Sequence, residues 1–322
     1  MAKIRFYDGS TYSGGIRDGK PHGPGVYKMI DGSVYRGRFA NGAFNGRGCF
    51  RMADGRFYKG EFRGGKFHGK GVLKNSEMIY KGEFADGKFD GKGKEKTLDY
   101  TYEGEYKAGM YDGQGKLVSE DGNVYEGDFK CGKPHGNGTC VYNDGKTYVG
   151  EFADGRLSGK GRLAYPDGSY YEGYFKDGAQ HGSGKAVYSD GSSYKGEYKN
   201  GTYSGKGRLV EADGMVCEGS FVDGELFGKA RIEYPDGNTY TGDVKDGEPH
   251  GRGSFRLAGS KAGYDGQFEH GRMSGKGRIV YANGDVYEGD FKDDKFHGNG
   301  TYTRARDGAK FSGRYEDGKF VG

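Results

Sequence analysis

The sequence predicts an all-β fold, a single-layer antiparallel sheet of about fourteen stacked β-hairpins. Three observations support this fold class. A Tyr-x-Gly-x-aromatic step recurs fourteen times, at intervals of 22 to 24 residues. Both halves of each interval alternate with a spacing of two, which is typical of strands, and neither half shows the spacing of a helix. The chain has 68 glycines that fall at fixed places in the repeat, whereas collagen has glycine at every third residue.

The step itself forms the first strand of each repeat. Counting its first residue as position 0, position 2 is always glycine and position 4 is always apolar. Alternate residues of a strand lie on one face, so positions 0, 2 and 4 share a face. Position 7 is glycine except at Asp294, which predicts a turn. In order, the steps begin at Tyr12, Tyr35, Tyr58, Tyr80, Tyr102, Tyr125, Tyr148, Tyr171, Tyr194, Cys217, Tyr240, Tyr264, Tyr287 and Phe311.

A second strand follows the turn. Positions 11 and 13 are usually Gly-x-Gly, and position 15 is apolar except at Glu95. Asp-Gly or Asn-Gly then predicts a tight hairpin turn into the next repeat. Because glycines and large rings share one face, we expect each ring to lie over the bare backbone of a neighbouring glycine, an arrangement called aromatic rescue.

The other face of the predicted sheet is charged. Positions 1 and 3 hold fourteen acidic and six basic residues, whereas positions 12 and 14 hold fifteen basic residues and no acidic one. Opposite charges on adjacent strands stabilise a sheet by roughly 0.2–1 kcal/mol per pair. We therefore expect a solvated ladder of ion pairs on this face, with no continuous basic patch.

Composition limits the function classes. Only 33% of the residues are hydrophobic, too few for a large globular core, yet 15% are aromatic, which argues against disorder. The net charge of +4 gives weak attraction for nucleic acid, and none is expected as a partner. The four cysteines lie at different phases of the repeat, which predicts reduced thiols in the cytosol. A bridge between Cys131 and Cys140 across a hairpin is the alternative.

No catalytic or metal-binding pattern stands apart from the repeat. Three segments such as Gly60–Lys66 match the start of a phosphate-binding loop, but each lacks the following Ser or Thr and lies in a hairpin. Six of the seven histidines share position 10, and the nearest of them are about 19 Å apart, too far to share a metal ion. We expect no enzyme activity, no cofactor and no metal site.

The units Asn123–Gly138 and Gly145–Gly155 resemble the MORN repeat (membrane occupation and recognition nexus). The resemblance extends from about Ile4 to Gly322. It implies an elongated, twisted antiparallel sheet, and we expect a single MORN array over residues 1–322 with partial repeats at 1–11 and 311–322. Irregular repeats near Tyr80, Tyr102, Cys217 and Tyr264 are either drift in a tolerant repeat or specialised contacts.

Chains made only of MORN repeats resemble cytoskeletal scaffolds. The resemblance implies a non-enzymatic, cytoplasmic, cytoskeleton-associated interaction protein. Its setting would be a cilium or flagellum axoneme, as in radial spokes, or a protist cytoskeletal structure. The alternative is a peripheral membrane protein that binds anionic phospholipids. Such binding needs clustered Lys and Arg, and their alternation with acids makes membrane lipid the less favoured partner.

The aromatic face is the expected partner site. An apolar face with no second layer usually binds something, and a helix or an extended peptide along a groove would fit. The candidate groove residues are Tyr35, Phe39, Phe44, Tyr58, Phe62, Phe67, Phe84 and Phe89. The terminal strands predict a second kind of contact, an end-to-end homodimer that pairs strand edges near Ile4, Phe6 and Phe320.

Overall fold

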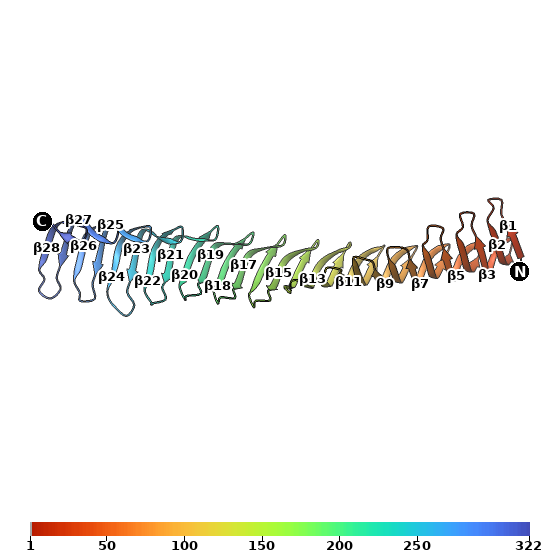
Figure 1. Ribbon diagram of the computed structural model, residues 1–322, viewed down its shortest axis with the longest axis horizontal. Coiled ribbons are helices and arrows are strands. Elements are labelled where there is room, and N and C mark those ends of the chain that lie inside the picture. The colour runs from red at the N-terminus through yellow and green to blue at the C-terminus, as the bar shows by residue number, and fades with distance from the viewer. Residues whose placement is uncertain (1) are drawn as a thin grey trace. The chain divides into compact units, whose positions relative to one another are not determined.

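The computed structural model describes residues 2–322, and in them 29 strands form one open antiparallel sheet (Figure 1). The chain divides into two compact units, one up to Ser158 and one from Gly159 to Gly322. Within each unit, strands that are consecutive in the chain pair antiparallel, so every hairpin lies beside the next. No helix occurs in the described residues. The all-β, stacked-hairpin fold class is confirmed.

The first unit contains β1 (Ala2–Arg5), β2 (Thr11–Arg17), β3 (Lys20–Lys28), β4 (Val34–Ala40), β5 (Ala43–Arg51), β6 (Phe57–Arg63), β7 (Lys66–Lys74), β8 (Ile79–Ala85), β9 (Lys88–Lys96), β10 (Tyr100–Lys107), β11 (Met110–Ser119), β12 (Val124–Lys130), β13 (Lys133–Val141) and β14 (Thr147–Ala153). The unit boundary falls inside β15 (Arg156–Ala164). The second unit contains β16 (Tyr170–Lys176), β17 (Ala179–Val187), β18 (Ser193–Lys199), β19 (Thr202–Val210), β20 (Val216–Val222), β21 (Glu225–Glu233), β22 (Thr239–Lys245), β23 (Glu248–Arg256), β24 (Gly263–Glu269), β25 (Arg272–Val280), β26 (Val286–Lys292), β27 (Lys295–Thr303), β28 (Lys310–Glu316) and β29 (Lys319–Phe320).

Two kinds of turn connect the strands. The turn at positions 6 and 7 has two residues with positive φ, as at Asn41 (49°) and Gly42 (85°), which is the type I′ geometry that matches strand twist. The Asp-Gly turn is longer than the tight hairpin that the sequence predicts. In the loop before β4, the Met29 amide donates to the Ser33 carbonyl (2.9 Å) and the Gly32 amide donates to the Met29 carbonyl (3.2 Å). Three residues therefore form this loop, with the glycine as a bulge.

The position-0 tyrosines form the centre of the core. Tyr35 is fully buried, and its ring lies over Gly37 of its own strand and Gly48 of the next, which pair with each other. A Cβ atom at Gly37 would come within 2.3 Å of the Tyr35 hydroxyl oxygen. That hydroxyl donates to the Arg38 carbonyl (2.9 Å), and the other position-0 tyrosines make the same bond three residues along their strands. The expected packing of rings on glycines is present, with one ring covering two glycines.

The two glycines of Gly-x-Gly have different roles. The second, at position 13, lies under the tyrosine ring. The first, at position 11, has positive φ, as at Gly46 (72°), and belongs to a bulge. There the register changes from Gly37 opposite Gly48 to Phe39 opposite Phe44, so three residues of β5 face one residue of β4. Because the bulge adds two residues, an even number, positions 9 and 13 still lie on one face of the sheet.

Rings from successive repeats interlock. Phe39 at position 4 is 3% exposed and meets Tyr35 edge-to-face at 5.1 Å. Phe62 meets the same Tyr35 from the following repeat at 5.0 Å. The same two contacts recur around Tyr58 in the first unit and Tyr264 in the second. Such pairs contribute about 0.5–1.5 kcal/mol each beyond burial. T-shaped contacts therefore run through the core of the first unit, and in the second unit they are interrupted at the Cys217 repeat.

Candidate functional site

The structure divides the eight predicted groove residues into two sets. Five of them are core residues with at most 3% exposure: Tyr35, Phe39, Tyr58, Phe62 and Phe84. The other three, Phe44, Phe67 and Phe89, occupy position 9 and are half-buried. A partner can therefore contact the position-9 rings directly, whereas the side chains at positions 0 and 4 are covered.

The position-9 rings cover the buried tyrosines. Phe67 stacks on Tyr58 with 3.9 Å between ring centroids and 15° between planes. Phe44, Phe89, Tyr111, Tyr203 and Phe296 stack in the same way on their own position-0 tyrosines, at 3.7–3.8 Å. One face of each of these rings packs on the buried tyrosine, and the other face points away from the sheet. The rings therefore form a flat apolar floor that a partner could contact.

An apolar hollow of about 520 Å³ opens on this floor near the start of the first unit. Its lining includes Pro21, Tyr27 and Phe44, together with Phe6. The Phe6 and Tyr27 rings lie 5.6 Å apart, and the Tyr27 and Phe44 rings lie 6.4 Å apart. Phe6 was expected at a pairing edge, whereas its ring lines this hollow.

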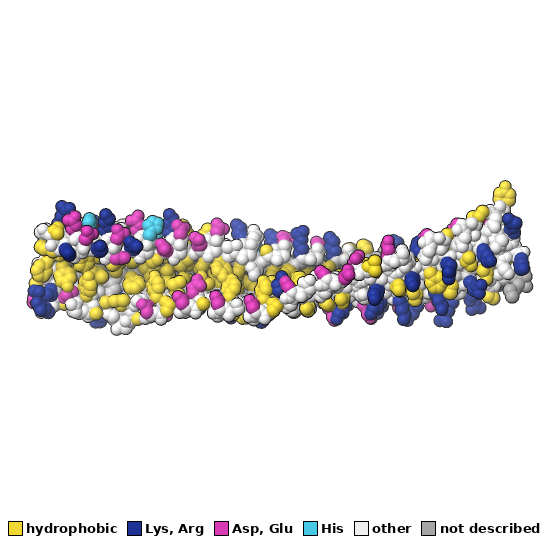
Figure 2. Space-filling view, in the orientation of Figure 1, with side chains coloured by type: hydrophobic (Ala, Val, Ile, Leu, Met, Phe, Trp, Pro, Cys, Tyr) yellow, Lys and Arg dark blue, Asp and Glu magenta, His cyan; other side chains and the backbone are white. Residues whose placement is uncertain are grey.

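In the second unit the same face shows as a band of hydrophobic side chains between charged margins (Figure 2). Its outer wall is formed at position 17, where Tyr165, Tyr188 and Leu257 are 37%, 41% and 42% exposed. The Tyr188 and Tyr203 hydroxyls lie 2.6 Å apart and join this wall to the position-9 floor. We call positions 9, 15 and 17 of this face the apolar trough.

Glu95 is the one charged side chain at position 15 of the trough among the described repeats. It is 8% exposed, and its Oε2 accepts hydrogen bonds from the hydroxyls of Tyr106 (3.1 Å) and Tyr111 (3.0 Å). Burial, and then the nearby carboxylate charge, raise the pKa of the Tyr106 hydroxyl. The sequence showed Glu95 as an exception to the pattern but did not reveal its two tyrosine partners, which are 11 and 16 residues away.

The charged face matches the expected ladder only in part. From β9 onward, several bases at positions 12 and 14 meet acids of the next repeat, as in Lys94–Glu103 (2.7 Å) and Arg208–Glu218 (2.8 Å). Strands β1 to β8 differ, because they carry fifteen Lys and Arg residues and only two acids, Glu61 and Glu83. The expected alternation of acids with bases is therefore absent from most of these eight strands. The sequence count, pooled over all repeats, hid the difference.

Nothing in residues 2–322 resembles a metal centre. No three His, Cys, Asp or Glu side chains there lie close enough to hold an ion, and no helix of that part could span a bilayer. The four cysteines in this range are free thiols. Burial raises the pKa of Cys217 to about 11 and also raises the pKa of Cys140, so both are poor nucleophiles at neutral pH.

The family model described as the MORN repeat matches thirteen consecutive segments of this chain. They are residues 12–34, 35–55, 58–76, 80–97, 102–124, 125–147, 148–170, 171–193, 194–216, 217–239, 240–259, 264–286 and 287–308. The chain belongs to the MORN repeat family. Curated proteins gave no significant match.

Solved structures show only distant likeness to this MORN array. A mutant TCP10 domain of Danio rerio CPAP is 20% identical, covering 67% of this chain and 96% of its own, with a TM-score of 0.33. The SAS-4 TCP domain of Drosophila melanogaster, in complex with a proline-rich motif of Ana2, is 15% identical, covering 56% and 85%, with a TM-score of 0.28. Virginiamycin B lyase of Staphylococcus aureus is 10% identical, covering 79% and 90%, with a TM-score of 0.14. These scores are too low to indicate a shared arrangement.

The irregular MORN repeat at Cys217 shows how the core compensates for a missing ring. Leu226 at position 9 is 4% exposed, and its Cδ1 occupies the space over Gly219. Ala230 replaces the glycine at position 13, and its methyl group lies in the seat that a tyrosine ring would fill. Three exchanged residues thus preserve a filled core, which argues for a coordinated variant of the repeat.

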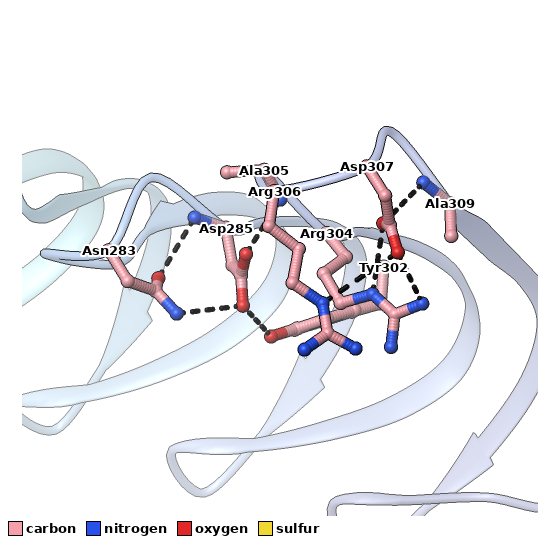
Figure 3. A network of polar contacts seen from close by, with 8 residues as sticks. All are labelled: Asn283, Asp285, Tyr302, Arg304, Ala305, Arg306, Asp307 and Ala309. Carbon is pink, nitrogen blue, oxygen red and sulfur yellow. Dashed lines mark hydrogen bonds and ion pairs between the residues drawn. The ribbon is translucent and has the colours of Figure 1, made fainter.

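Side chains also join successive Asp-Gly loops of the MORN array. In the last hairpins, Asp285 accepts hydrogen bonds from the Tyr302 hydroxyl (2.5 Å) and the Ala305 amide (2.7 Å), and Arg304 pairs with Asp307 at 2.8 Å (Figure 3). The bond to Asp285 raises the pKa of Tyr302 to about 12. Equivalent loop-to-loop bonds run from Ala53, Asn143 and Ala258 amides to Ser33, Asn123 and Asn238 side chains. These bonds hold the loop edge in register.

Proposed function

We propose that this MORN-repeat protein is a non-enzymatic scaffold of the cytoskeleton whose apolar trough binds a helix or an extended segment of a partner protein. The observation that carries the proposal is the floor of stacked position-9 rings, such as Phe44 and Phe67, with exposed tyrosines along its wall. Half-buried aromatic side chains in a concave apolar surface are the usual anchors of protein interfaces.

The cellular setting is the second part of the proposal. We place the protein in the cytoplasm, bound to a cytoskeletal structure, either a cilium or flagellum axoneme with a role like that of a radial-spoke component, or a protist cytoskeletal structure. The support is that MORN repeats match 13 segments over most of the chain, as in the all-MORN scaffolds that it resembles. Fluorescent tagging in the source cell, with detergent extraction before imaging, tests this: signal lost with the soluble fraction would contradict it.

Trough binding is tested with variants that spare the core. Tyr165→Ser, Tyr188→Ser and Leu257→Ser change exposed trough side chains. Val141→Ser, Val149→Ser and Val222→Ser change apolar residues on the opposite face that are at least 40% exposed, and they serve as controls. Partners crosslinked to the intact chain and identified by mass spectrometry should be lost in the first triple variant and retained in the control. Equal recovery from both would exclude the trough as the site.

End-to-end pairing of two copies is the remaining proposal. Ile4 pairs with Tyr12 and is half-buried, and Phe320 pairs with Tyr315 and is 49% exposed. A second chain that added a strand at either place would cover these side chains. Light scattering over a range of concentrations and at low salt tests the dimer, because a monomer throughout would eliminate it.

A further inference from the structure

The first eight strands carry a charge pattern that the rest of the sheet does not share. Strands β1 to β5 contain nine Lys and Arg residues and no acidic residue, and β6 to β8 add six bases and two glutamates. Six of these bases lie at positions 1 and 16, on the face opposite the buried tyrosines. We call this set the basic face: Lys28, Arg36, Arg51, Lys59, Lys74 and Lys81. All six are exposed, and Lys and Arg side chains are visible along these strands in Figure 2.

Most cross-strand neighbours of the basic face are neutral. Across the strands Arg36 faces Val26 and Cys49, and Lys59 faces Cys49 and Val72. Lys81 faces Val72 on one side and another base, Lys94, on the other. In the other repeats position 1 is mostly acidic and position 14 is mostly basic. In these repeats position 1 holds a base, and the position-14 residue that faces it from the preceding repeat is neutral.

The charges of the basic face have no internal partner. None of its six residues has a carboxylate within 4.0 Å among residues 2–322, whereas the matching ladder bases Arg162, Arg208 and Arg278 each reach a glutamate. Like charges on neighbouring strands destabilise a sheet. A face that keeps them gains stability when an external anion covers it.

The surface is hollowed at both ends of this stretch. A hollow of about 570 Å³ is lined by Lys3, Arg5, Lys28 and Arg36, with no acidic residue. A second hollow, of about 830 Å³, has four lysines in its lining, and there Glu83, Glu103 and Glu105 offset part of the positive charge. Both hollows lie within the first unit.

We propose that the basic face binds an extended acidic segment of a partner protein. Equivalent residues of successive repeats, such as Arg36, Lys59 and Lys81, are two strands apart, which is about 10 Å. An extended chain advances about 3.3 Å per residue, so an acidic residue at every third position matches that spacing. The aliphatic side chains between the bases, Val26 and Val72 among them, suit apolar residues in the same segment.

A narrow chain fits this face better than a membrane or a nucleic acid. The bases stand on strands in concave stretches of surface, where a flat bilayer makes little contact. Single-stranded nucleic acids bind by stacking bases on exposed aromatic rings, and the tyrosines of these repeats are buried on the opposite face. Since the proposed scaffold role uses the apolar trough, this binding goes beyond it, and either one can fail without the other.

The test is fluorescence anisotropy of the purified full chain with a labelled peptide of repeated Glu-Val-Ser units, and with its Lys-Val-Ser counterpart. The variant Arg36→Gln, Lys59→Gln, Lys81→Gln removes three charges from the basic face. Arg162→Gln, Arg208→Gln, Arg278→Gln removes the same charge from the ladder and is the control. We expect salt-sensitive binding of the acidic peptide, weakened on the order of tenfold in the first variant and less than about twofold in the control.

Several outcomes would overturn the proposal. Equal weakening in both variants would mean that net charge alone attracts the peptide. Failure of the acidic peptide to bind at low salt would exclude an acidic segment. Tighter binding to vesicles of phosphatidylcholine with phosphatidylserine, or to polyuridylic acid, than to the peptide would assign the face to lipid or to nucleic acid. Circular dichroism of both variants checks that the fold is unchanged, as expected for exposed side chains.

Discussion

Strands β1–β8 and strands β16–β29 have the same kind of core but differently charged faces. In both regions fully buried tyrosines, such as Tyr58 and Tyr240, lie over paired glycines. The first region has fifteen bases and two acids on its strands, and the second has nineteen bases and twelve acids. Core and charged positions alternate along each strand, so one set can change while the other stays. The fold therefore does not depend on how its charged face is composed.

This comparison also separates stability from recognition. The ladder pairs of the second region are exposed, with Arg208 and Glu218 at 52% and 49%, and such pairs contribute about 0–1 kcal/mol each. Exposed charges act mainly on partner choice and association rate. We infer that the core holds both regions to a similar stability and that the charged faces select different ligands.

Alkaline pH should lower the folding stability of both regions alike, and this is the largest effect that we expect. Burial raises the pKa of Tyr35 and Tyr240 to about 12, from the ordinary value of 10. Between these values the unfolded chain releases protons that the folded chain retains, so stability is complete below pH 10 and is lost as pH rises toward 12. Circular dichroism and tyrosinate absorbance should change together. If pulse proteolysis showed one region unfolding at a clearly lower pH than the other, the two cores would not be equally stable.

Matched glycine substitutions test whether the two cores are equivalent. A Cβ at Gly71 would lie 2.4 Å from the Tyr58 hydroxyl oxygen, and one at Gly207 would lie 2.2 Å from that of Tyr194. Gly71→Val and Gly207→Val should each lower the free energy of unfolding by about 3 kcal/mol or more, because the ring must leave its seat. Urea denaturation measures both, with the exposed Val149→Thr as control. A cost confined to one region would show that the cores differ.

The Cys217 repeat allows a sharper test of the ring seat. Cys217→Tyr alone should destabilise the protein, because the Ala230 methyl group and Leu226 fill the space over Gly219. Adding Ala230→Gly should recover the loss, with a coupling energy of roughly 1–2 kcal/mol in a double-mutant cycle. Additive effects would mean that the alanine and the missing tyrosine are unrelated.

Neutralising exposed charges should have the smallest effect on stability. The sign of that effect should differ between the basic face and the ion-pair ladder. At low salt, neutralising Arg36, Lys59 and Lys81 should leave the melting temperature unchanged or raise it, since it removes repulsion. Neutralising Arg162, Arg208 and Arg278 should lower stability by a few tenths of a kcal/mol per lost pair. Differential scanning calorimetry with and without salt measures both. The same sign in both variants would contradict the difference between the faces.

Sequence periodicity predicted the strands, the shared face of positions 0, 2 and 4, and the glycine seats, because each follows from a spacing of two. It did not separate Gly46 from Gly48, since a bulge between paired strands leaves no mark in a pattern of alternating residues. It also placed Tyr35 and Phe39 in an open groove, because composition cannot show that Phe62 of the next repeat and the stacked Phe44 cover them. The basic face was missed because charges were counted over all repeats together.

The local strand pairing has a consequence for how the chain folds. Val34 pairs with Arg51, which pairs with Phe57, so each contact in the first unit closes only a short loop. Closing a short loop costs little conformational entropy, and proteins whose contacts are local in sequence fold quickly. Each hairpin can therefore form on the one before it during synthesis, while later repeats are still being translated. Nascent chains stalled after whole repeats should already resist protease, and the newest hairpin should be the only one left open.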